Sequence, residues 1–511
     1  MKSINDLSMK INNKYPYLLT VFVLLVVPFS VFGQLSASAQ TAENERLTSA
    51  NQSGRKVART YYDLDQTVLK AQYYFIGDDS TNVDGEYKLF HVTGELKSIA
   101  NFKQGEIQGR AIEYYPNGNE KLVGSYKEGK KDGIFKEYYF EGGLMAEYEC
   151  KDDKRNGNAK VYNEKQVIVQ EANYVNDHLD GIIKTFYPNG KLKAKTPFKL
   201  DKIDGLVEEY YEDGQLKRTI TFKNHKPNGE EKTFYKNGVL RTTTTYLDGE
   251  MSGDFKSYYD NGILELETIN IHGKKNGYFR RYTRDSVLVQ DAMYKNGQLH
   301  GDNILYFDNG NLKQEVKYRA GQQLYSKIYR ENGNPLKEID FGNTIKDRKE
   351  THYYANGNKE KQIEFQNEQK VGEWKYFYSN GKKKVEENYK DDKLHGKRET
   401  YFSNGKTHLK EEYAFGKQQG ITKEYSKEGD LVSEIDYKLG KKWGVATYYH
   451  PNGKILAEGV FYKDIKNGKW YYYNEDEKLI RREVHRRGKI SSAKSYSKGK
   501  PRKKSPFKKR R

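Results

Sequence analysis

Residues 372–396 read GEWKYFYSNGKKKVEENYKDDKLHG. Trp374 and the tyrosines two and four residues after it have the spacing of side chains on one face of a β-strand. An Asn-Gly pair ending at Gly381 follows directly, and Asn-Gly between alternating apolar residues is the strongest short-range signal of a β-hairpin. The stretch therefore predicts a hairpin that reverses at Gly381.

The same pattern recurs along the chain in two glycine series. The first series follows paired aromatic residues at steps of 24 residues, or 48 where one unit lacks it, with a single step of 23: Gly94, Gly118, Gly142, Gly190, Gly214, Gly238, Gly262, Gly310, Gly333, Gly357, Gly381, Gly405, Gly429 and Gly453. The second series keeps the same period: Gly85, Gly109, Gly133, Gly157, Gly181, Gly205, Gly229, Gly253, Gly277, Gly301, Gly372, Gly396, Gly420, Gly444 and Gly468. A fixed period of this length is the mark of a repeat protein. We expect the glycines to mark reversals of an extended backbone.

These units predict an all-β fold. A single hairpin is marginal in water, so each unit has to pair with its neighbours. We expect an elongated repeat of about seventeen 24-residue β-hairpins, forming a twisted or coiled antiparallel sheet. Where proline leads the turn, as in Pro188-Asn189-Gly190, we expect a type I turn with glycine at a left-handed bulge position.

The composition fits a thin sheet better than a thick globular core. Only 35% of residues are hydrophobic, yet 14% are aromatic, with 45 Tyr against 3 Trp. Disorder is the competing interpretation for so polar a chain, but disordered segments are poor in aromatic residues. The aromatic stripe has two interpretations: it packs across strands within the sheet, or it is left exposed for a partner protein or a glycan.

The N-terminus has the order of a secretory signal peptide. In residues 1–39, lysines precede an apolar run over 17–32, and small residues follow it. We expect cleavage before Gln40, with Gln34 as the alternative; an uncleaved membrane anchor is the competing possibility. Residues 40–60 are polar and predict a linker or a short cap. Export to the periplasm, the cell envelope or the outside of the cell follows, with no transmembrane domain after removal of the signal.

The remaining chain divides into a repeat array over 61–495 and a basic disordered tail over 496–511. A possible seam in the array lies near 318–350, where the second glycine series is lost twice. Residues 481–511 hold fifteen Lys and Arg against one acid, Glu483. This tail either solubilises the chain or binds an anionic envelope surface such as lipid head groups. Nucleic acid is not expected in an exported protein. The candidate polyanion-binding residues are Lys498, Lys500, Arg502, Lys503, Lys504, Lys508, Lys509, Arg510 and Arg511.

The residue patterns do not favour catalysis, a metal or a cofactor. Cys150 is the single cysteine, which removes a disulfide framework and multi-cysteine zinc sites. His300 and His395 share a position in the repeat and are expected in loops. Acidic residues lie among lysines on expected strands, which is typical of a solvated face, and adjacent acids there point to opposite faces and cannot act as a pair: Glu137, Glu208, Glu209, Glu386, Glu387, Glu411 and Glu412.

The unit resembles the variant MORN repeat of bacteria, found in proteins labelled as the YwqK-type antitoxin component of toxin–antitoxin systems. Gly372-Glu373-Trp374 keeps the Gly-x-Trp element and Pro116-Asn117-Gly118 keeps the turn. The resemblance covers about residues 61–495 and implies consecutive hairpins that serve protein assembly. We therefore expect a non-catalytic exported scaffold for protein or envelope-surface interaction. The alternatives are an antitoxin or immunity-like protein that neutralises a toxin, and a protein that binds or acts on envelope polysaccharide.

Overall fold

The computed structural model describes residues 45–48, 54–503 and 507. The expected signal peptide, residues 1–39, lies outside this part of the chain. The described residues contain 42 β-strands and no helix, which confirms the all-β antiparallel hairpin repeat. By their internal contacts they form two compact units, one ending at Gly262 and the other beginning at Ile263.

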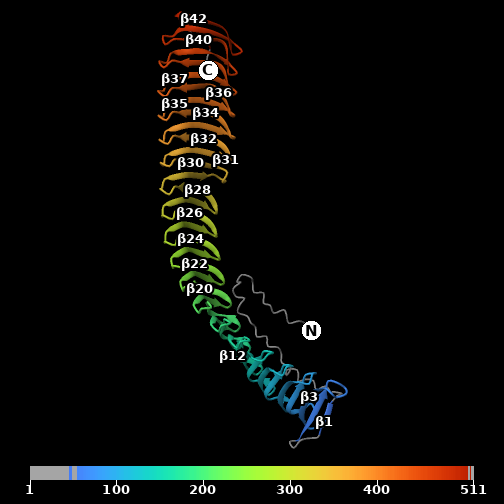
Figure 1. The fold of residues 1–511 in the computed structure, drawn as a ribbon. Helices are drawn as coiled ribbons and strands as arrows, with labels where there is room; N and C mark the ends of the chain where they lie inside the picture. The colour runs from blue at the N-terminus through green and yellow to red at the C-terminus, as the bar shows by residue number, and fades with distance from the viewer. Residues whose placement is uncertain (1–44, 49–53, 504–506, 508–511) are drawn as a thin grey trace. The chain divides into compact units, whose positions relative to one another are not determined.

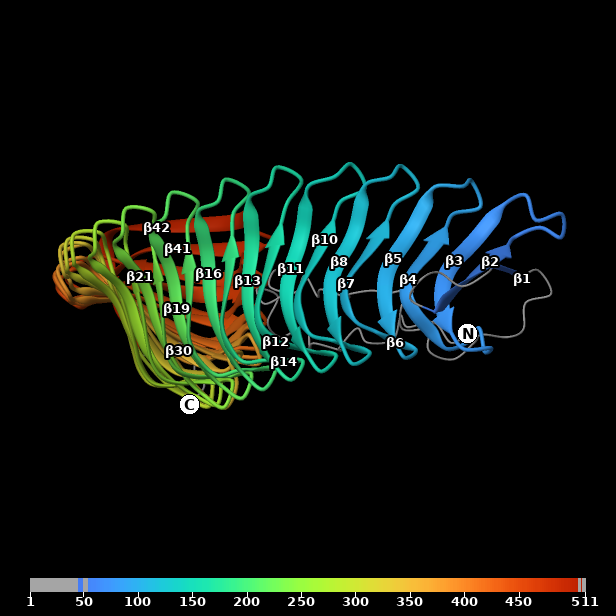
Figure 2. The same cartoon turned by 90° about the horizontal axis from the view of Figure 1, so that it is seen from below.

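The strands of the first unit are β1 (Glu45–Thr48), β2 (Arg55–Tyr61), β3 (Leu69–Ile76), β4 (Val83–Phe90), β5 (Leu96–Lys103), β6 (Glu106–Ile107), β7 (Gly109–Tyr114), β8 (Glu120–Lys127), β9 (Lys130–Lys131), β10 (Gly133–Tyr138), β11 (Leu144–Lys151), β12 (Lys154–Tyr162), β13 (Ile168–Val175), β14 (His178–Leu179), β15 (Gly181–Phe186), β16 (Leu192–Lys199), β17 (Lys202–Ile203), β18 (Gly205–Tyr210), β19 (Leu216–Lys223), β20 (Lys226–Phe234), β21 (Leu240–Leu247) and β22 (Glu250–Tyr258). They run antiparallel in chain order (Figure 2). The two-residue strands are the starts of strands that a bulge interrupts, so that β16 pairs with both β17 and β18.

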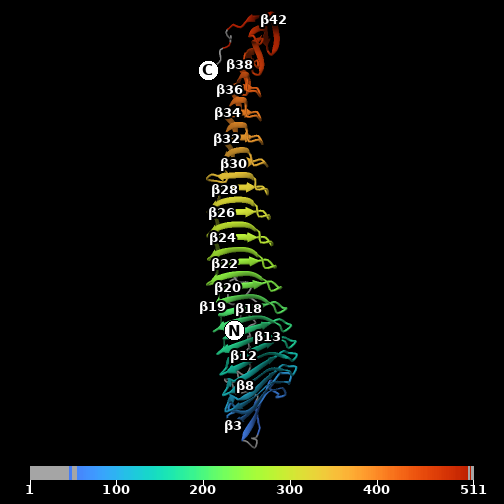
Figure 3. The same ribbon diagram turned by 90° about the vertical axis from the view of Figure 1, so that its left-hand side faces the viewer.

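The strands of the second unit are β23 (Leu264–Ile271), β24 (Lys274–Tyr282), β25 (Leu288–Lys295), β26 (Gln298–Tyr306), β27 (Leu312–Arg319), β28 (Gln322–Tyr329), β29 (Pro335–Phe341), β30 (Arg348–Tyr353), β31 (Lys359–Gln366), β32 (Gln369–Phe377), β33 (Lys383–Lys390), β34 (Lys393–Tyr401), β35 (Thr407–Ala414), β36 (Lys417–Tyr425), β37 (Leu431–Lys438), β38 (Lys441–Tyr449), β39 (Ile455–Tyr462), β40 (Ile465–Tyr473), β41 (Lys478–Arg486) and β42 (Lys489–Pro501). Each again pairs with its neighbours in the sequence (Figure 1 and Figure 3).

Two kinds of turn join most of the strands, and longer loops over 62–68, 77–82 and 342–347 join β2 to β3, β3 to β4 and β29 to β30. In the first kind the Gly190 amide donates to the Tyr187 carbonyl at 2.8 Å and Gly190 has φ +82°, which confirms the expected type I turn with a left-handed glycine. The second kind joins one unit to the next through two residues, such as Leu200 and Asp201, with φ +47° and +64°. Positive φ at both positions is the geometry of a type I′ hairpin turn. Each connection of this kind is therefore a tight hairpin, and within each unit successive strands form an antiparallel meander.

The second glycine series does not mark reversals, which corrects that expectation. Gly205 lies inside a strand, at a bulge between the register pairs Phe198–Ile203 and Lys195–Glu208. Its φ is +124°, and a Cβ there would lie 2.9 Å from the Pro197 side chain. Glycine is needed because its neighbour on the adjacent strand fills the space where a side chain would stand.

One face of each sheet is buried, and small residues make room on it for large ones. Trp470 is fully buried, and a Cβ on Gly459 would lie 2.2 Å from its ring. Gly124 makes room for Phe135 in the first unit in the same way. The first unit has its larger core cluster between Ala100 and Phe222, and the second has one around Trp470.

The ends of the array differ from the expectation. Within 40–60, residues 45–48 and 55–60 belong to β1 and β2, so the array begins before residue 61. At the other end β42 continues to Pro501, so residues 496–501 are ordered against β41 rather than disordered. Backbone pairing does not require a periodic sequence, which is why this Ser- and Lys-rich stretch gave no strand signal.

Residues 318–350 contain no break in strand pairing. Strands β27 to β31 pair in order, and the boundary between the compact units lies at Gly262 instead. In a 24-residue unit, β26 has two more residues than β25 between the register pairs Ala292–Asn303 and Tyr294–Leu299, and these two residues form the bulge. In the shortened unit, β28 has only one more residue than β27 between the register pairs Lys317–Tyr325 and Tyr318–Gln323. A smaller bulge therefore absorbs the one-residue deletion.

Candidate functional surfaces

Many of the turns of the first kind begin with a tyrosine, and this tyrosine joins its unit to the next one. The Tyr378 hydroxyl donates to the Tyr401 carbonyl at 2.8 Å, and the Tyr187 hydroxyl donates to the Tyr210 carbonyl at the same distance. In both cases donor and acceptor are 23 residues apart. The turn asparagine adds a parallel bond, since the Asn380 side chain donates to the next turn at 3.0 Å. Sequence reasoning missed this ladder, although the tyrosine that recurs at the start of many of these turns was a signal of it.

The other aromatic residues pack across strands, as the first interpretation of the stripe expected. Phe135 and Tyr148 stack with their ring centroids 5.9 Å apart, and Phe461 meets Trp470 edge-on at 5.1 Å. These rings lie on the buried face of their sheets. A subset of aromatic residues at the turns remains exposed and is described below.

Several carboxylates are buried, which corrects the expectation of a solvated face. Arg398 lies between Glu387 and Glu411 on the buried side, with its Nε 3.1 Å from Glu387 and a second, shorter ion pair to Glu411. Glu386, next in sequence, instead pairs with Lys383 at 2.7 Å. Adjacent acids therefore do point to opposite faces, and each is neutralised by a cation.

Glu137 is the exception among these acids. Its side chain is buried and accepts a hydrogen bond from the Tyr148 hydroxyl at 3.0 Å. Burial raises the pKa of Glu137, although the hydrogen bond from Tyr148 opposes that shift. The described residues hold no group of three or more His, Cys, Asp or Glu side chains placed to bind a metal.

Glu350, between β29 and β31, is the most strongly shifted acid of the second unit. Burial opposes its ionisation, but hydrogen bonds from Arg348, Lys337 and His352 outweigh burial and lower the pKa of Glu350 to about 2. The contacts are 2.7, 2.9 and 2.8 Å long. Two of the donors lie on β30 beside Glu350 and the third, Lys337, lies on β29, so this carboxylate joins two neighbouring strands.

The two repeated histidines and the single cysteine lie within strands of the sheet. His300 and His395 lie within β26 and β34 rather than in the loops expected for them, and the backbone amides of Ala320 and Phe415 donate toward their Nδ1 atoms, both at 3.4 Å. Cys150 is free and buried, and burial raises the pKa of its thiol to about 11.

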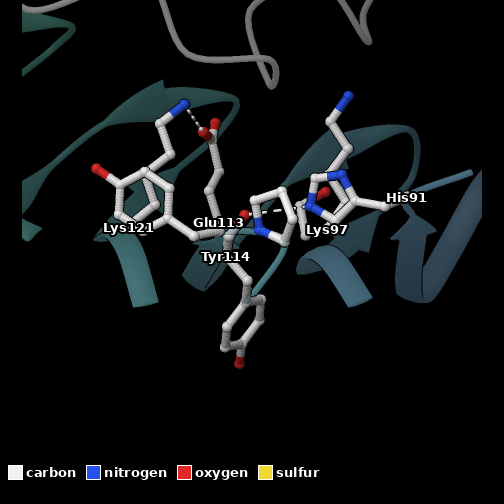
Figure 4. Close-up of a pocket in the computed structure, with 8 residues that line it drawn as sticks. His91, Lys97, Glu113, Tyr114 and Lys121 are labelled. Atoms are coloured by element: carbon white, nitrogen blue, oxygen red, sulfur yellow. Dashed lines mark hydrogen bonds and ion pairs between the residues drawn. The ribbon is translucent and has the colours of Figure 1, made fainter. Parts of the chain in front are cut away.

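A small pocket of about 100 Å³ lies in the first unit beside His91 (Figure 4). His91 stands where other units have the turn tyrosine, and its Nε2 lies 3.4 Å from the Tyr114 carbonyl. Lys121 lies 3.8 Å from the buried Glu113 carboxylate. The volume is well below that of typical ligand pockets, which are about 300–1,000 Å³.

The structure places the candidate polyanion-binding residues in three groups. Lys498 and Lys500 are exposed on β42, and Lys503 is exposed just after it. Arg502 instead makes contacts within the chain. Its guanidinium lies 3.3 Å from Glu477, 3.8 Å from the buried Glu458, and over the Tyr473 ring. Outside the described residues lie Lys504, Lys508, Lys509, Arg510 and Arg511.

The surface around β41 and β42 is strongly basic. Residues 478–503 contain eleven Lys and Arg and one acid, Glu483. Burial opposes ionisation of Glu483, but hydrogen bonds from His485 and Tyr472 and the charge of Arg481 lower its pKa. The single acid is therefore neutralised locally, and the lysines of β42 face solvent as an uncompensated positive patch. In the described part of the chain no helix is long and apolar enough to cross a membrane.

Comparison with solved structures yields only distant similarity. The chain is 11% identical to a chain of the crystal structure of TcdB2-TccC3-Cdc42, with a TM-score of 0.15, covering 85% of this chain and 31% of that one. It is 10% identical to a chain of the Photorhabdus luminescens Tc holotoxin pore, with a TM-score of 0.13, covering 87% and 29%. It thus spans under a third of these chains. No curated protein matches.

The family comparison is specific. The model of the MORN repeat variant matches residues 179–200, 203–224, 227–248, 251–269, 299–320, 349–367, 370–391 and 444–464. Most of these segments begin within the bulge that precedes a hairpin and end at the next type I′ turn. The chain therefore carries tandem copies of the MORN repeat variant.

Proposed function

We propose that this protein is a non-catalytic, exported scaffold on which partner proteins assemble. One observation supports this function above the others: the side chains that look chemically active in the sequence join one repeat to the next. The Tyr378 hydroxyl donates to the following unit, and Arg398 is held between Glu387 and Glu411. A repeated surface of this kind is suited to extended binding.

Export is supported by the order of charge, apolar run and small residues in 1–39. N-terminal sequencing of the protein purified from its native host tests this part. A chain that begins at Gln40 or Gln34 is expected, and an intact N-terminus in the cytoplasmic fraction would contradict export.

The basic patch is proposed to contact an anionic envelope surface through Lys498, Lys500 and Lys503. The test is sedimentation of the full chain with envelope membranes, comparing wild type with the triple Lys→Gln variant at these positions. Truncation before residue 496 is unsuitable because β42 and Arg502 are part of the fold. The matched control replaces three exposed lysines at the ends of strands of the first unit with glutamine: Lys103, Lys127 and Lys151.

Loss of co-sedimentation in the first variant but not in the control is expected. Equal sedimentation of all three proteins would remove the patch from the proposed function. The scaffold itself is tested by affinity capture from the same fraction after cross-linking, where a defined set of proteins should be retained. The scaffold function would be contradicted if no protein were retained above the level of a tag-only control.

A further inference from the structure

Two consecutive type I′ turns of the second unit carry a large apolar residue where the backbone is left-handed. Phe415 has φ +47° and is 59% exposed, and Leu439 has φ +54° and is 68% exposed. The turn before them has Asp391 at this position. Left-handed backbone is unfavourable for residues other than Gly, Asn and Asp, so bulky residues there are held against a local preference. They also expose apolar surface, although the Phe415 ring packs on one side against the His395 ring, with the centroids 4.7 Å apart.

The next turn extends this surface. Tyr462 and Ile465 flank it, are 49% and 46% exposed, and the Tyr462 ring lies 4.5 Å from that of Trp443, centroid to centroid. We name the set of Phe415, Leu439, Trp443, Tyr462 and Ile465 the apolar ridge. It follows three successive turns at one edge of β35–β40. Turns of successive units are two strands apart, about 9.6 Å, so the ridge runs for about 19 Å.

Lysines lie close to the apolar ridge. Lys438 precedes Leu439 and lies 5.5 Å from the Trp443 ring centroid, and Lys463 lies 5.5 Å from the Tyr462 ring centroid. Lys417 and Lys441 begin the strands after the first two turns and are exposed. An apolar line edged with positive charge is complementary to an apolar stripe edged with negative charge.

We propose that the apolar ridge binds an amphipathic helix of a partner protein, with an apolar stripe of about two heptads between acidic flanks. Positions i and i+7 of a helix are about 10.5 Å apart, close to the spacing of the turns, so one helix can contact successive tips. This proposal rests on the scaffold function and names the surface that performs it.

The test uses variants that should not harm the fold. Phe415→Asn and Leu439→Asn together install a residue suited to left-handed backbone, so local stability is expected to stay level or rise. The matched control is Leu200→Asn, because Leu200 has φ +47° and is exposed at the same turn position in the first unit. Hydrogen exchange of the turns checks that each variant is folded.

The probe is a labelled synthetic helix with a leucine stripe over two heptads and glutamate flanks, measured by fluorescence anisotropy with the full chain. Wild type and the Leu200→Asn variant are expected to bind it alike, and the double variant at least tenfold more weakly. A peptide of the same composition with the stripe shuffled, and one with lysine flanks, should each bind at least tenfold more weakly to wild type.

The proposal is overturned if the double variant binds the helix like wild type, if the shuffled peptide binds equally well, or if the labelled helix shows no binding when the protein is raised to about 100 µM. Binding of anionic phosphatidylglycerol vesicles that is lost in the double variant, without helix binding, would make the ridge a membrane contact and also overturn it. If cross-linked partners are still captured by the double variant, the ridge fails while the scaffold function stands.

Discussion

Replacing Gly459 with alanine tests the packing of the second unit most directly. Gly459 does not have positive φ, so alanine causes no left-handed backbone strain there, and the three atoms nearest to the new Cβ all belong to Trp470. The new Cβ would lie 2.2, 2.4 and 2.6 Å from three ring atoms of a side chain that is fully buried. The ring also donates through Nε1 to the Val460 carbonyl at 3.3 Å, which holds it in place.

Overpacking of this kind costs about 1–3 kcal/mol, and here the upper end is expected because the ring has no free space to move into. The chain is a repeat array, whose global unfolding need not be two-state, so a local measurement is needed. Hydrogen exchange of the amides of β39 and β40 should accelerate by roughly 5- to 160-fold, corresponding to about 1–3 kcal/mol.

Two controls make this prediction specific. Gly453→Ala places a Cβ in open space but at φ +78°, so it should affect its own turn and leave Trp470 undisturbed. Combining Gly459→Ala with Trp470→Leu should cost less than the sum of the two single changes, because the smaller side chain leaves room for the methyl group. A Gly459→Ala protein with unchanged exchange in β39 and β40 and a still-buried Trp470 would refute the reasoning.

Three further outcomes follow from the contacts described above. Tyr378→Phe removes the hydroxyl that donates to the Tyr401 carbonyl, so hydrogen exchange at that turn should show a local loss of about 0.5–1.5 kcal/mol, and an unchanged turn would mean that the ladder adds no stability. The pKa of Glu350 is lowered to about 2 in the folded chain, so the ionised carboxylate stabilises the fold fully above its unfolded pKa of about 4.3, and this stabilisation is lost as the pH falls through 2. Hydrogen exchange in β29 and β30 should therefore accelerate as the pH falls from about 4.3 to 2. The Glu350→Gln variant should not show this pH dependence. Burial raises the pKa of the Cys150 thiol to about 11, so at pH 8 a thiol reagent should label it only as fast as the first unit opens locally, and labelling at the rate of a free thiol would contradict its burial.

The turns show how much of the fold a single sequence reveals. Asn-Gly before a polar strand fixes the first kind of turn, because glycine at the left-handed position has a local physical cause. The second kind was not identified, since pairs such as Leu200-Asp201 or Phe415-Gly416 give no consistent residue signal. Their geometry is imposed by the pairing of the strands on either side, which is a tertiary effect.

The candidate surfaces were harder to predict than the turns. The charge of the C-terminal segment correctly identifies a basic patch, yet charge alone cannot separate Lys498, which faces solvent, from Arg502, which covers Glu458. That distinction depends on how residues more than forty positions apart meet. The apolar ridge has the same origin, because its members become neighbours only when successive units pair.

The bulge beside Tyr325 has a consequence for how such arrays change over evolution. In a β-strand, losing one residue normally turns every later side chain to the opposite face. Here the loss is taken up where the backbone already carries surplus residues, and the downstream alternation is preserved. Each bulge is thus a site at which a repeat can gain or lose a residue while the side chains of the following repeats stay on the same face of the sheet.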